Sequence, residues 1–146
     1  MARKRHSGIT EQRKASIHRL EDAEVLFRGG RWRGAMYMAG YAVECRLKYK
    51  LLEQWSCRTL EELEDELEKK GNLRSLYTHS LKVLLRLAGG LERLQQHNKV
   101  LWSKFAAVVD AWQPAWRYST DLGDHDEAEN FLAAAKAVIT WIDNSL

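Results

Sequence analysis

The stretch 113–125 carries the side chains best suited to chemistry. It brings aromatic rings, hydroxyls, acids, the guanidinium of Arg117 and the imidazole of His125 into one short segment. An imidazole titrates near neutral pH, so His125 could take the proton from a ribose 2′-hydroxyl. The forked donors of Arg117 match phosphate oxygens and would stabilise the charge that develops there. These residue types are suited to cleavage of a phosphodiester without a metal ion.

The same stretch also has an ordinary structural interpretation. Asp124, followed three residues later by Glu127, forms a capping box for a helix. Arg117 could cap the carbonyls of the preceding helix or pair with a nearby acid. The helix dipole favours a neutral His125, whereas the flanking acids Asp124 and Asp126 favour a charged one. Both interpretations stay open for the Asp and Ser positions as well as for Arg117 and His125.

A second candidate site is the segment Thr78-His79-Ser80. His79 lies just before the expected start of a helix, where a lone histidine is either a site residue or a cap or partly buried side chain. The remaining histidines are scattered, and no cluster has the spacing of a zinc or carboxylate–metal site. No phosphate-binding glycine loop or nucleophile elbow is present. We therefore expect neither a metal nor a cofactor.

The segment 32–55 reads as one helix that is apolar nearly all round, which is typical of a buried helix. At 100° per residue, one apolar stripe consists of Trp32, Met36, Ala39, Val43, Leu47 and Leu51. The second stripe consists of Met38, Tyr41, Ala42, Cys45, Tyr49 and Leu52. Two apolar faces in so small a chain indicate that the helix packs on its neighbours and on a second subunit.

A narrow polar strip on that helix holds Arg33, Tyr37, Glu44 and Lys48. Glu44 and Lys48 are spaced i,i+4 in the order that favours an ion pair. Alternatively, Glu44 could hold Arg117 in position. Arg33 belongs to the segment 28–34, which resembles a Gly-Arg box with an interleaved aromatic residue. Glu44, Lys48 and Arg33 are therefore candidate binding or supporting residues. His79 and Tyr118, from the other two segments, complete this set.

Helical periodicity predicts the elements that position these side chains. Further helices are expected over about 10–28, with Thr10 as its N-cap, and over about 60–70, 79–88, 91–112 and 124–142. Gly29-Gly30 is short enough to make the first two helices antiparallel neighbours. The sequence therefore predicts an all-α, up-and-down bundle of about five helices over 9–146, preceded by a disordered basic arm at 1–8.

Charge is unevenly distributed along the 146 residues, although the net charge is only +3. Residues 1–58 carry 13 Lys and Arg against 6 Asp and Glu, whereas residues 59–146 carry 10 against 14. A basic half could meet phosphate or an acidic partner. Cys45 and Cys57 lack metal-ligand spacing and read as small buried thiols, which favours a reducing cytoplasm. We expect no secretory signal and no membrane span.

Three blocks in order resemble the HEPN domain family: residues 35–48, residues 78–81, and Arg117-Tyr118 ahead of a final alanine-rich helix. The resemblance extends from about residue 13 to residue 143. It implies a helical bundle that dimerises along its long helices. Many members are metal-independent ribonucleases, often toxins paired with a nucleotidyltransferase antitoxin, and others are non-catalytic RNA- or nucleotide-binding modules.

The catalytic motif of the family is an arginine, four to six residues, and then a histidine. Here seven residues separate Arg117 from His125, and Tyr118 replaces the polar residue that usually follows the arginine. The resemblance implies a homodimer that acts on RNA or nucleotides, in which two such loops would form one composite cleft. If it cleaves RNA, Arg117 would hold the phosphate and His125 would act as base. The alternative is a non-catalytic module that binds a partner or a ligand.

Overall fold

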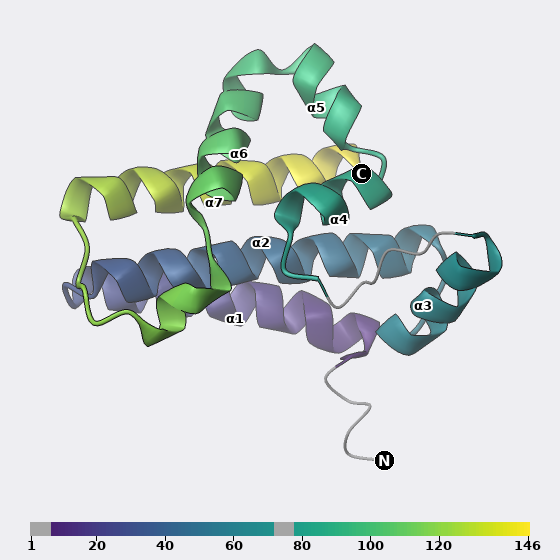
Figure 1. Ribbon diagram of the computed structural model, residues 1–146, viewed down its shortest axis with the longest axis horizontal. Coiled ribbons are helices and arrows are strands. Elements are labelled where there is room, and N and C mark those ends of the chain that lie inside the picture. The colour runs from purple at the N-terminus through teal and green to yellow at the C-terminus, as the bar shows by residue number, and fades with distance from the viewer. Residues whose placement is uncertain (1–6, 72–77) are drawn as a thin grey trace.

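The computed structural model describes residues 7–71 and 78–146, and within them it contains helices and no strand (Figure 1). The α-helices are α1 (Ile9–Arg28), α2 (Trp32–Gln54), α3 (Leu60–Lys69), α4 (Leu81–Leu87), α5 (Leu91–His97), α6 (Lys99–Ala111) and α7 (His125–Ser145). A 3-10 helix, η2 (Pro114–Tyr118), precedes α7. The all-α class is confirmed, and the described residues form seven α-helices rather than about five. None of these helices is long and apolar enough to cross a membrane.

The helix expected over 91–112 is broken at Asn98. The backbone of Asn98 is extended, with φ −147° and ψ 81°, and its side-chain oxygen accepts a hydrogen bond from the Leu101 N–H at 3.0 Å. Asn98 therefore ends α5 and caps α6. This break and η2 account for the additional elements.

The N-cap of the first helix lies two residues earlier than expected, at Gly8 in place of Thr10. Gly8 has no side chain with which to make a capping bond, and its backbone forms an isolated bridge with Thr59. The hydroxyl of Ser7 donates to Glu61 at 2.6 Å. Ser7 and Gly8 are thus held against α3, and the rest of the expected arm, residues 1–6, lies outside the described residues.

Helix α2 forms the centre of the domain, between α1 and α7 (Figure 1). It turns back on α1 through Gly29 and Gly30, and Gly30 has a φ of +76°, which favours glycine. Most of α2 is buried by the same chain, including Ala42, Cys45 and Leu52 of the second apolar stripe. The burial of α2 therefore does not by itself indicate a second subunit.

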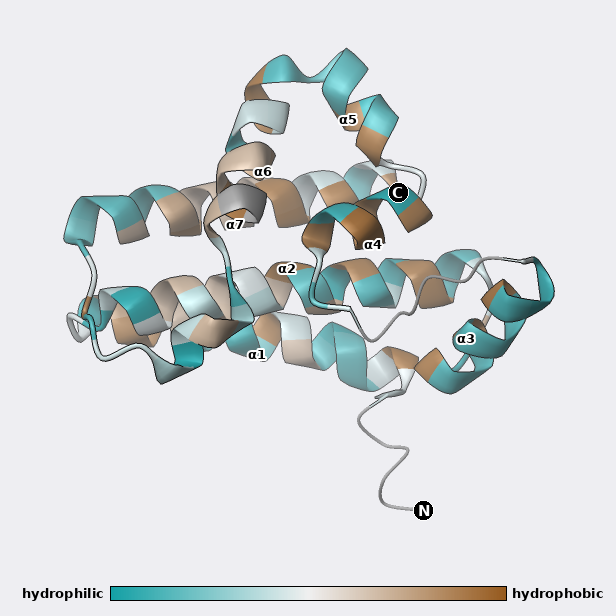
Figure 2. Cartoon of the chain, viewed as in Figure 1, coloured by the Kyte–Doolittle hydropathy of each residue, from teal (hydrophilic) through white to brown (hydrophobic). Residues whose placement is uncertain are grey.

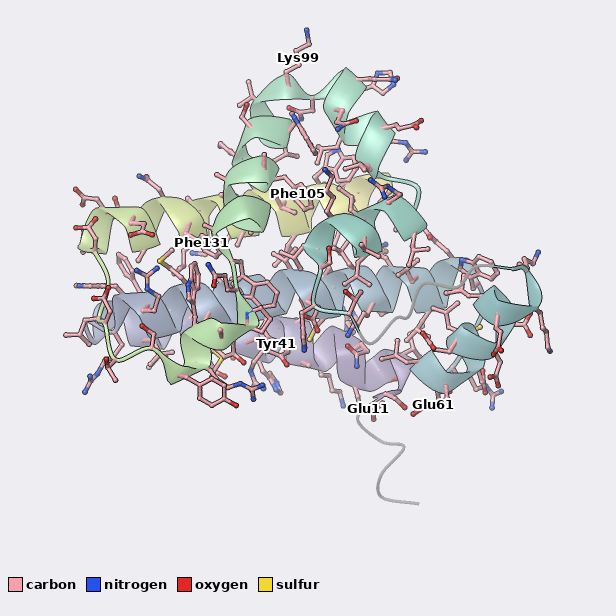
Figure 3. All side chains as sticks on the ribbon, viewed as in Figure 1. Glu11, Tyr41, Glu61, Lys99, Phe105 and Phe131 are labelled. Carbon is pink, nitrogen blue, oxygen red and sulfur yellow. The ribbon has the colours of Figure 1, made fainter. Side chains whose placement is uncertain are left out.

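The remaining helices cover α2 and α7 from outside. Hydrophobic residues gather where α2, α4 and α7 face one another, whereas α3 is largely hydrophilic (Figure 2). Helices α5 and α6 form an arch over this layer, with Phe105 buried beneath it and Lys99 pointing away at its tip (Figure 3).

Trp112 lies directly against the backbone of α2 at Gly40. A Cβ atom added to Gly40 would lie 2.1 Å from the nearest indole carbon of Trp112. The indole Nε1–H donates to the Tyr37 carbonyl at 3.0 Å. The contact needs glycine at position 40, and it fixes the point at which the segment between α6 and α7 begins.

Candidate functional site

A cleft of about 630 Å³, here called the arginine groove, lies between the end of α1, the start of α2 and the segment that follows α6. Its walls are formed by Leu26, Arg31, Arg33, Gly34, Tyr37, Met38, Trp116, Arg117, Ser119, Thr120, Asp121 and Leu122. The groove therefore combines three guanidinium groups with an indole ring, three hydroxyls and the carboxylate of Asp121. The guanidinium groups and hydroxyls are donors suited to the phosphate of a nucleotide.

Two of the three arginines in the groove form no ion pair with any described residue. Arg31 and Arg117 are both exposed. The guanidinium of Arg117 lies over the ring of Tyr118, with 5.3 Å between its central carbon and the ring centroid. Tyr118 is itself 78% exposed. Arg31 and Arg117 are accordingly accessible from solvent in the groove, and Tyr118 lies beside Arg117.

Arg33, the third arginine, is occupied by structural contacts. Its guanidinium lies 3.7 Å from a carboxylate oxygen of Asp121 and 3.5 Å from one of Glu127, and 4.8 Å from the centre of the Trp116 ring. Its backbone N–H donates to the Leu122 carbonyl at 2.8 Å. Arg33 thus fastens the segment before α7 to α2.

Hydrogen bonds within this segment support the structural interpretation of its Asp and Ser positions. Ser119 Oγ accepts from the Asp121 N–H at 3.2 Å, and Asp121 accepts from the Gly123 N–H at 2.9 Å. Asp124 caps α7 by accepting from the Glu127 N–H at 2.9 Å. The segment is therefore an ordered part of the groove wall.

His125 lies outside the arginine groove, as the first residue of α7. Its ring packs against Phe27 and Trp32, with centroid separations of 5.1 and 5.0 Å. Its Nδ1 lies 2.8 Å from Asp126 Oδ1, and this hydrogen bond raises the pKa of His125. Within one chain, the structure thus does not bring His125 and Arg117 into the same cavity.

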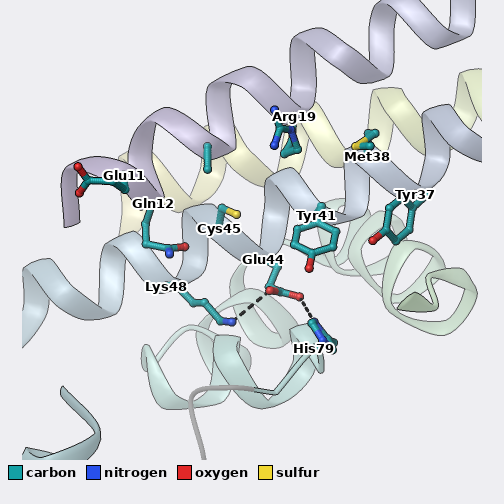
Figure 4. Close-up of a pocket in the computed structure, with 11 residues that line it drawn as sticks. Glu11, Gln12, Arg19, Tyr37, Met38, Tyr41, Glu44, Cys45, Lys48 and His79 are labelled. Atoms are coloured by element: carbon teal, nitrogen blue, oxygen red, sulfur yellow. Dashed lines mark hydrogen bonds and ion pairs between the residues drawn. The ribbon is translucent and has the colours of Figure 1, made fainter. Parts of the chain in front are cut away.

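A second cavity of about 610 Å³, here called the glutamate cavity, opens between α1 and α2 farther along α2 (Figure 4). Glu44 lies at its base and is 3% exposed. Glu44 Oε2 accepts from Lys48 Nζ at 3.1 Å, and Oε1 lies 2.8 Å from His79 Nδ1. The expected Glu44–Lys48 pair is present and buried. Glu44 holds His79, and no contact with Arg117 occurs among the described residues.

Aromatic rings connect the two cavities. Tyr37, together with Met38, lines both of them. The ring of Tyr41 lies 6.1 Å from that of His79, and that of Trp112 lies 6.5 Å from His79. Burial and the charge of Glu44 raise the pKa of Tyr41, while Arg117 acts in the opposite direction. Tyr37 and Met38 therefore form a wall common to the two cavities.

The contacts of Trp112 with the His79 ring and with the backbone of α2 were not predicted from the sequence. The close approach to Gly40 was a signal that could have been considered, because a glycine within an otherwise bulky buried helix often marks a close contact.

The side chains that line the two cavities are suited to hydrogen bonding and proton transfer. Cys45 lines the glutamate cavity, but burial raises the pKa of its thiol to about 11, so it remains protonated near neutral pH. Among the side chains that the structure describes, no group of three or more His, Cys, Asp or Glu is arranged to hold a metal ion.

Comparison with known families identifies the domain. The family described as HEPN domain matches residues 11–145, which is nearly the whole chain. No characterised protein and no solved structure matched the chain. The match agrees with the all-α architecture and with the three sequence blocks that resemble this family. The chain belongs to the HEPN domain family, a family of nucleotide- and RNA-related modules.

Proposed function

We propose that this HEPN protein binds the backbone of single-stranded RNA in the arginine groove. The observation that carries the proposal is that Arg31 and Arg117 line one groove and form no ion pair with any described residue. A guanidinium without an acid partner retains its full charge and its fork of donors for a phosphate. Two of them could hold successive phosphates.

The surroundings of the two arginines suit a nucleotide as well as a phosphate. The exposed ring of Tyr118, next to Arg117 in the chain, offers a flat surface on which a base can stack. The hydroxyls of Ser119 and Thr120 add donors for phosphate or sugar oxygens. Stacking and phosphate contacts are tolerant of sequence, so we expect RNA binding with little sequence preference.

The geometry favours binding over cleavage by the pair Arg117 and His125. A general base must reach the proton that it removes, and His125 does not line the groove and has its Nδ1 hydrogen-bonded to Asp126. The seven residues that separate Arg117 from His125 include Gly123, which has a φ of +81°.

The proposals for the location, oligomeric state and partner of this protein rest on its family alone. We infer a cytoplasmic homodimer, with a nucleotidyltransferase-type antitoxin as a candidate partner. A nucleotidyltransferase reading frame beside the gene would support that partnership. The arginine groove does not depend on either proposal, since all of its walls come from one chain.

The binding proposal predicts a specific loss of affinity. Fluorescence anisotropy with a labelled single-stranded RNA should show dissociation constants about tenfold higher for Arg117→Ala and for Arg31→Ala, as expected for the loss of one charge-assisted contact. Arg117→Lys should recover only part of the loss, because the point charge returns without the fork.

Arg86→Ala is the matched control for this experiment. Arg86 is exposed on α4, does not line the groove, and its replacement removes the same charge. The proposal predicts wild-type affinity for this variant. Equal losses for Arg86→Ala and Arg117→Ala would mean that binding follows net charge, and would contradict a site in the groove.

A further inference from the structure

We propose that His79 is the general base of a metal-independent ribonuclease site, with Glu44 as its positioning residue. The inference rests on the proposed function, because the RNA it acts on is the one held in the arginine groove. It assigns the general base to His79 in the glutamate cavity in place of His125, and it keeps Arg117 as the group that holds the phosphate.

The contact between His79 and Glu44 has the geometry of a catalytic dyad. The carboxylate of Glu44 is 3% exposed, and the side chain of His79 is 43% exposed. Their contact, Oε1 to Nδ1, is 2.8 Å long. A buried acid therefore orients a histidine whose other side reaches solvent, which is the arrangement by which a carboxylate fixes a catalytic imidazole.

Lys48 completes the arrangement from one turn farther along α2. Its ammonium, 3.1 Å from Glu44 Oε2, balances the buried carboxylate and occupies the oxygen that His79 does not use. The other oxygen is left to accept the Nδ1–H of His79. In that tautomer Nε2 carries a lone pair, and Nε2 forms no hydrogen bond with any described residue.

His125 lacks these features, although it also touches a carboxylate. Its partner Asp126 has a side chain that is 86% exposed and lies next to it in the chain. An exposed carboxylate is free to change its rotamer and is screened by water, so it orients an imidazole weakly. The buried Glu44 therefore makes His79 the better-oriented base.

The two cavities lie next to each other along α2. Tyr37 lines both cavities, and the ring of Tyr41 lies 6.1 Å from that of His79. The positive charge of Arg117 acts to lower the pKa of Tyr41. A strand with one phosphate at Arg117 would pass over this aromatic surface, and the adjacent 2′-hydroxyl would be presented toward His79.

The reaction that follows is transesterification. Nε2 of His79 takes the proton of the 2′-hydroxyl, and the 2′-oxygen forms a bond to phosphorus as the bond to the 5′-oxygen breaks. The 5′-oxygen leaves with a proton from water, and His79 returns its own proton to solvent. Arg117 stabilises the charge on the phosphate oxygens. The products are a 2′,3′-cyclic phosphate and a 5′-hydroxyl.

The test is cleavage of a 5′-labelled, mixed-sequence RNA by the full chain in excess EDTA, with the product ends identified. Wild-type protein should give cyclic phosphate ends and leave a DNA of the same sequence intact. His79→Asn should lower the single-turnover rate at least about 100-fold, the usual contribution of a general base, without weakening RNA affinity in the anisotropy assay. His97→Asn, on the exposed surface of α5, should cleave at the wild-type rate.

Glu44→Gln tests positioning separately. The amide keeps the shape of the side chain but can present an N–H to His79, so the rate should fall about tenfold or more while RNA affinity stays unchanged. Asn at position 79 can still donate to Glu44, so His79→Asn keeps the test valid if Glu44→Gln fails to fold.

Each remaining outcome overturns the inference. RNA binding without cleavage, or cleavage by His79→Asn at the wild-type rate, would remove His79 from catalysis and leave the binding proposal intact. Loss of cleavage in His125→Asn but not in His79→Asn would assign the base to His125. Absence of both binding and cleavage would overturn this inference together with the proposed function.

Discussion

Two histidines with the same intrinsic chemistry have different surroundings in this protein. His79 is held by the buried Glu44, whereas His125 is held by the exposed Asp126. The hydrogen bond to Asp126, aided by the charges of Glu129, Asp126 and Asp124, raises the pKa of His125. His125 is therefore more often charged near neutral pH than a free imidazole, and the carboxylate that holds it is exposed to solvent.

NMR titration of the His125 ring protons should show a pKa above its ordinary value of 6.5, and Asp126→Asn should lower it. Because the pKa is raised in the folded state, the interaction stabilises the fold below the unfolded pKa. That contribution is lost as the pH rises through the folded pKa. A titration that Asp126→Asn leaves unchanged would contradict the assigned contact.

Side-chain contacts were predictable from the sequence only where a local rule applied. The Glu44–Lys48 pair and the Asp124 cap follow from spacing along one helix. The contact between Glu44 and His79 joins positions far apart in the chain, and no local pattern indicates it. The same holds for Arg33, whose acidic partners depend on how the segment before α7 folds back.

Within α2, the two glycines should respond oppositely to alanine. A Cβ at Gly40 would overlap the Trp112 ring at 2.1 Å, so Gly40→Ala should destabilise the fold by about 1–3 kcal/mol through overpacking. At Gly34 the nearest atom lies 3.6 Å away, an ordinary contact, so Gly34→Ala should stabilise by up to about 1 kcal/mol through helix propensity.

Urea unfolding of the two glycine variants measures this difference. Because both substitutions add the same methyl group to the same helix, any difference between them reports the surroundings of each position. Equal stability of the two variants would mean that Trp112 does not lie on the backbone of α2. Loss of the Trp112 contact should also weaken RNA binding, since Trp112 fixes the start of the segment that carries Arg117.

Most helices were predicted correctly because their apolar residues keep a helical period and their ends carry strong signals. The exception is the segment 91–112, in which Leu94, Leu101 and Phe105 are all buried, so the pattern appears continuous across Asn98. Asn98 ends one helix and caps the next, a role that its residue type allows but that periodicity cannot reveal.

For the molecule as a whole, the sequence predicted the all-α class and the family, but its argument for a dimer was indirect. It relied on the two apolar faces of α2, and the structure buries most of that helix within one chain. Intramolecular packing of seven α-helices was not foreseeable from a pattern that suggested five. The proposal of a dimer therefore rests on membership of the family and not on α2.

We predict a homodimer in solution, and light scattering after gel filtration gives its mass directly. The expected mass is twice the 16.9 kDa of one chain. A mass of one chain across micromolar concentrations would contradict the dimer. It would leave RNA binding untouched, because one chain supplies every wall of the arginine groove.

The salt dependence of RNA binding tests the arginine groove most directly. The logarithm of the affinity should fall linearly with the logarithm of the salt concentration for the wild-type protein. Arg117→Ala should make that slope shallower by about 0.7, the value for one phosphate contact on a single strand, whereas Arg86→Ala should leave it unchanged. An affinity independent of salt, or one slope shared by all three proteins, would contradict phosphate binding in the groove.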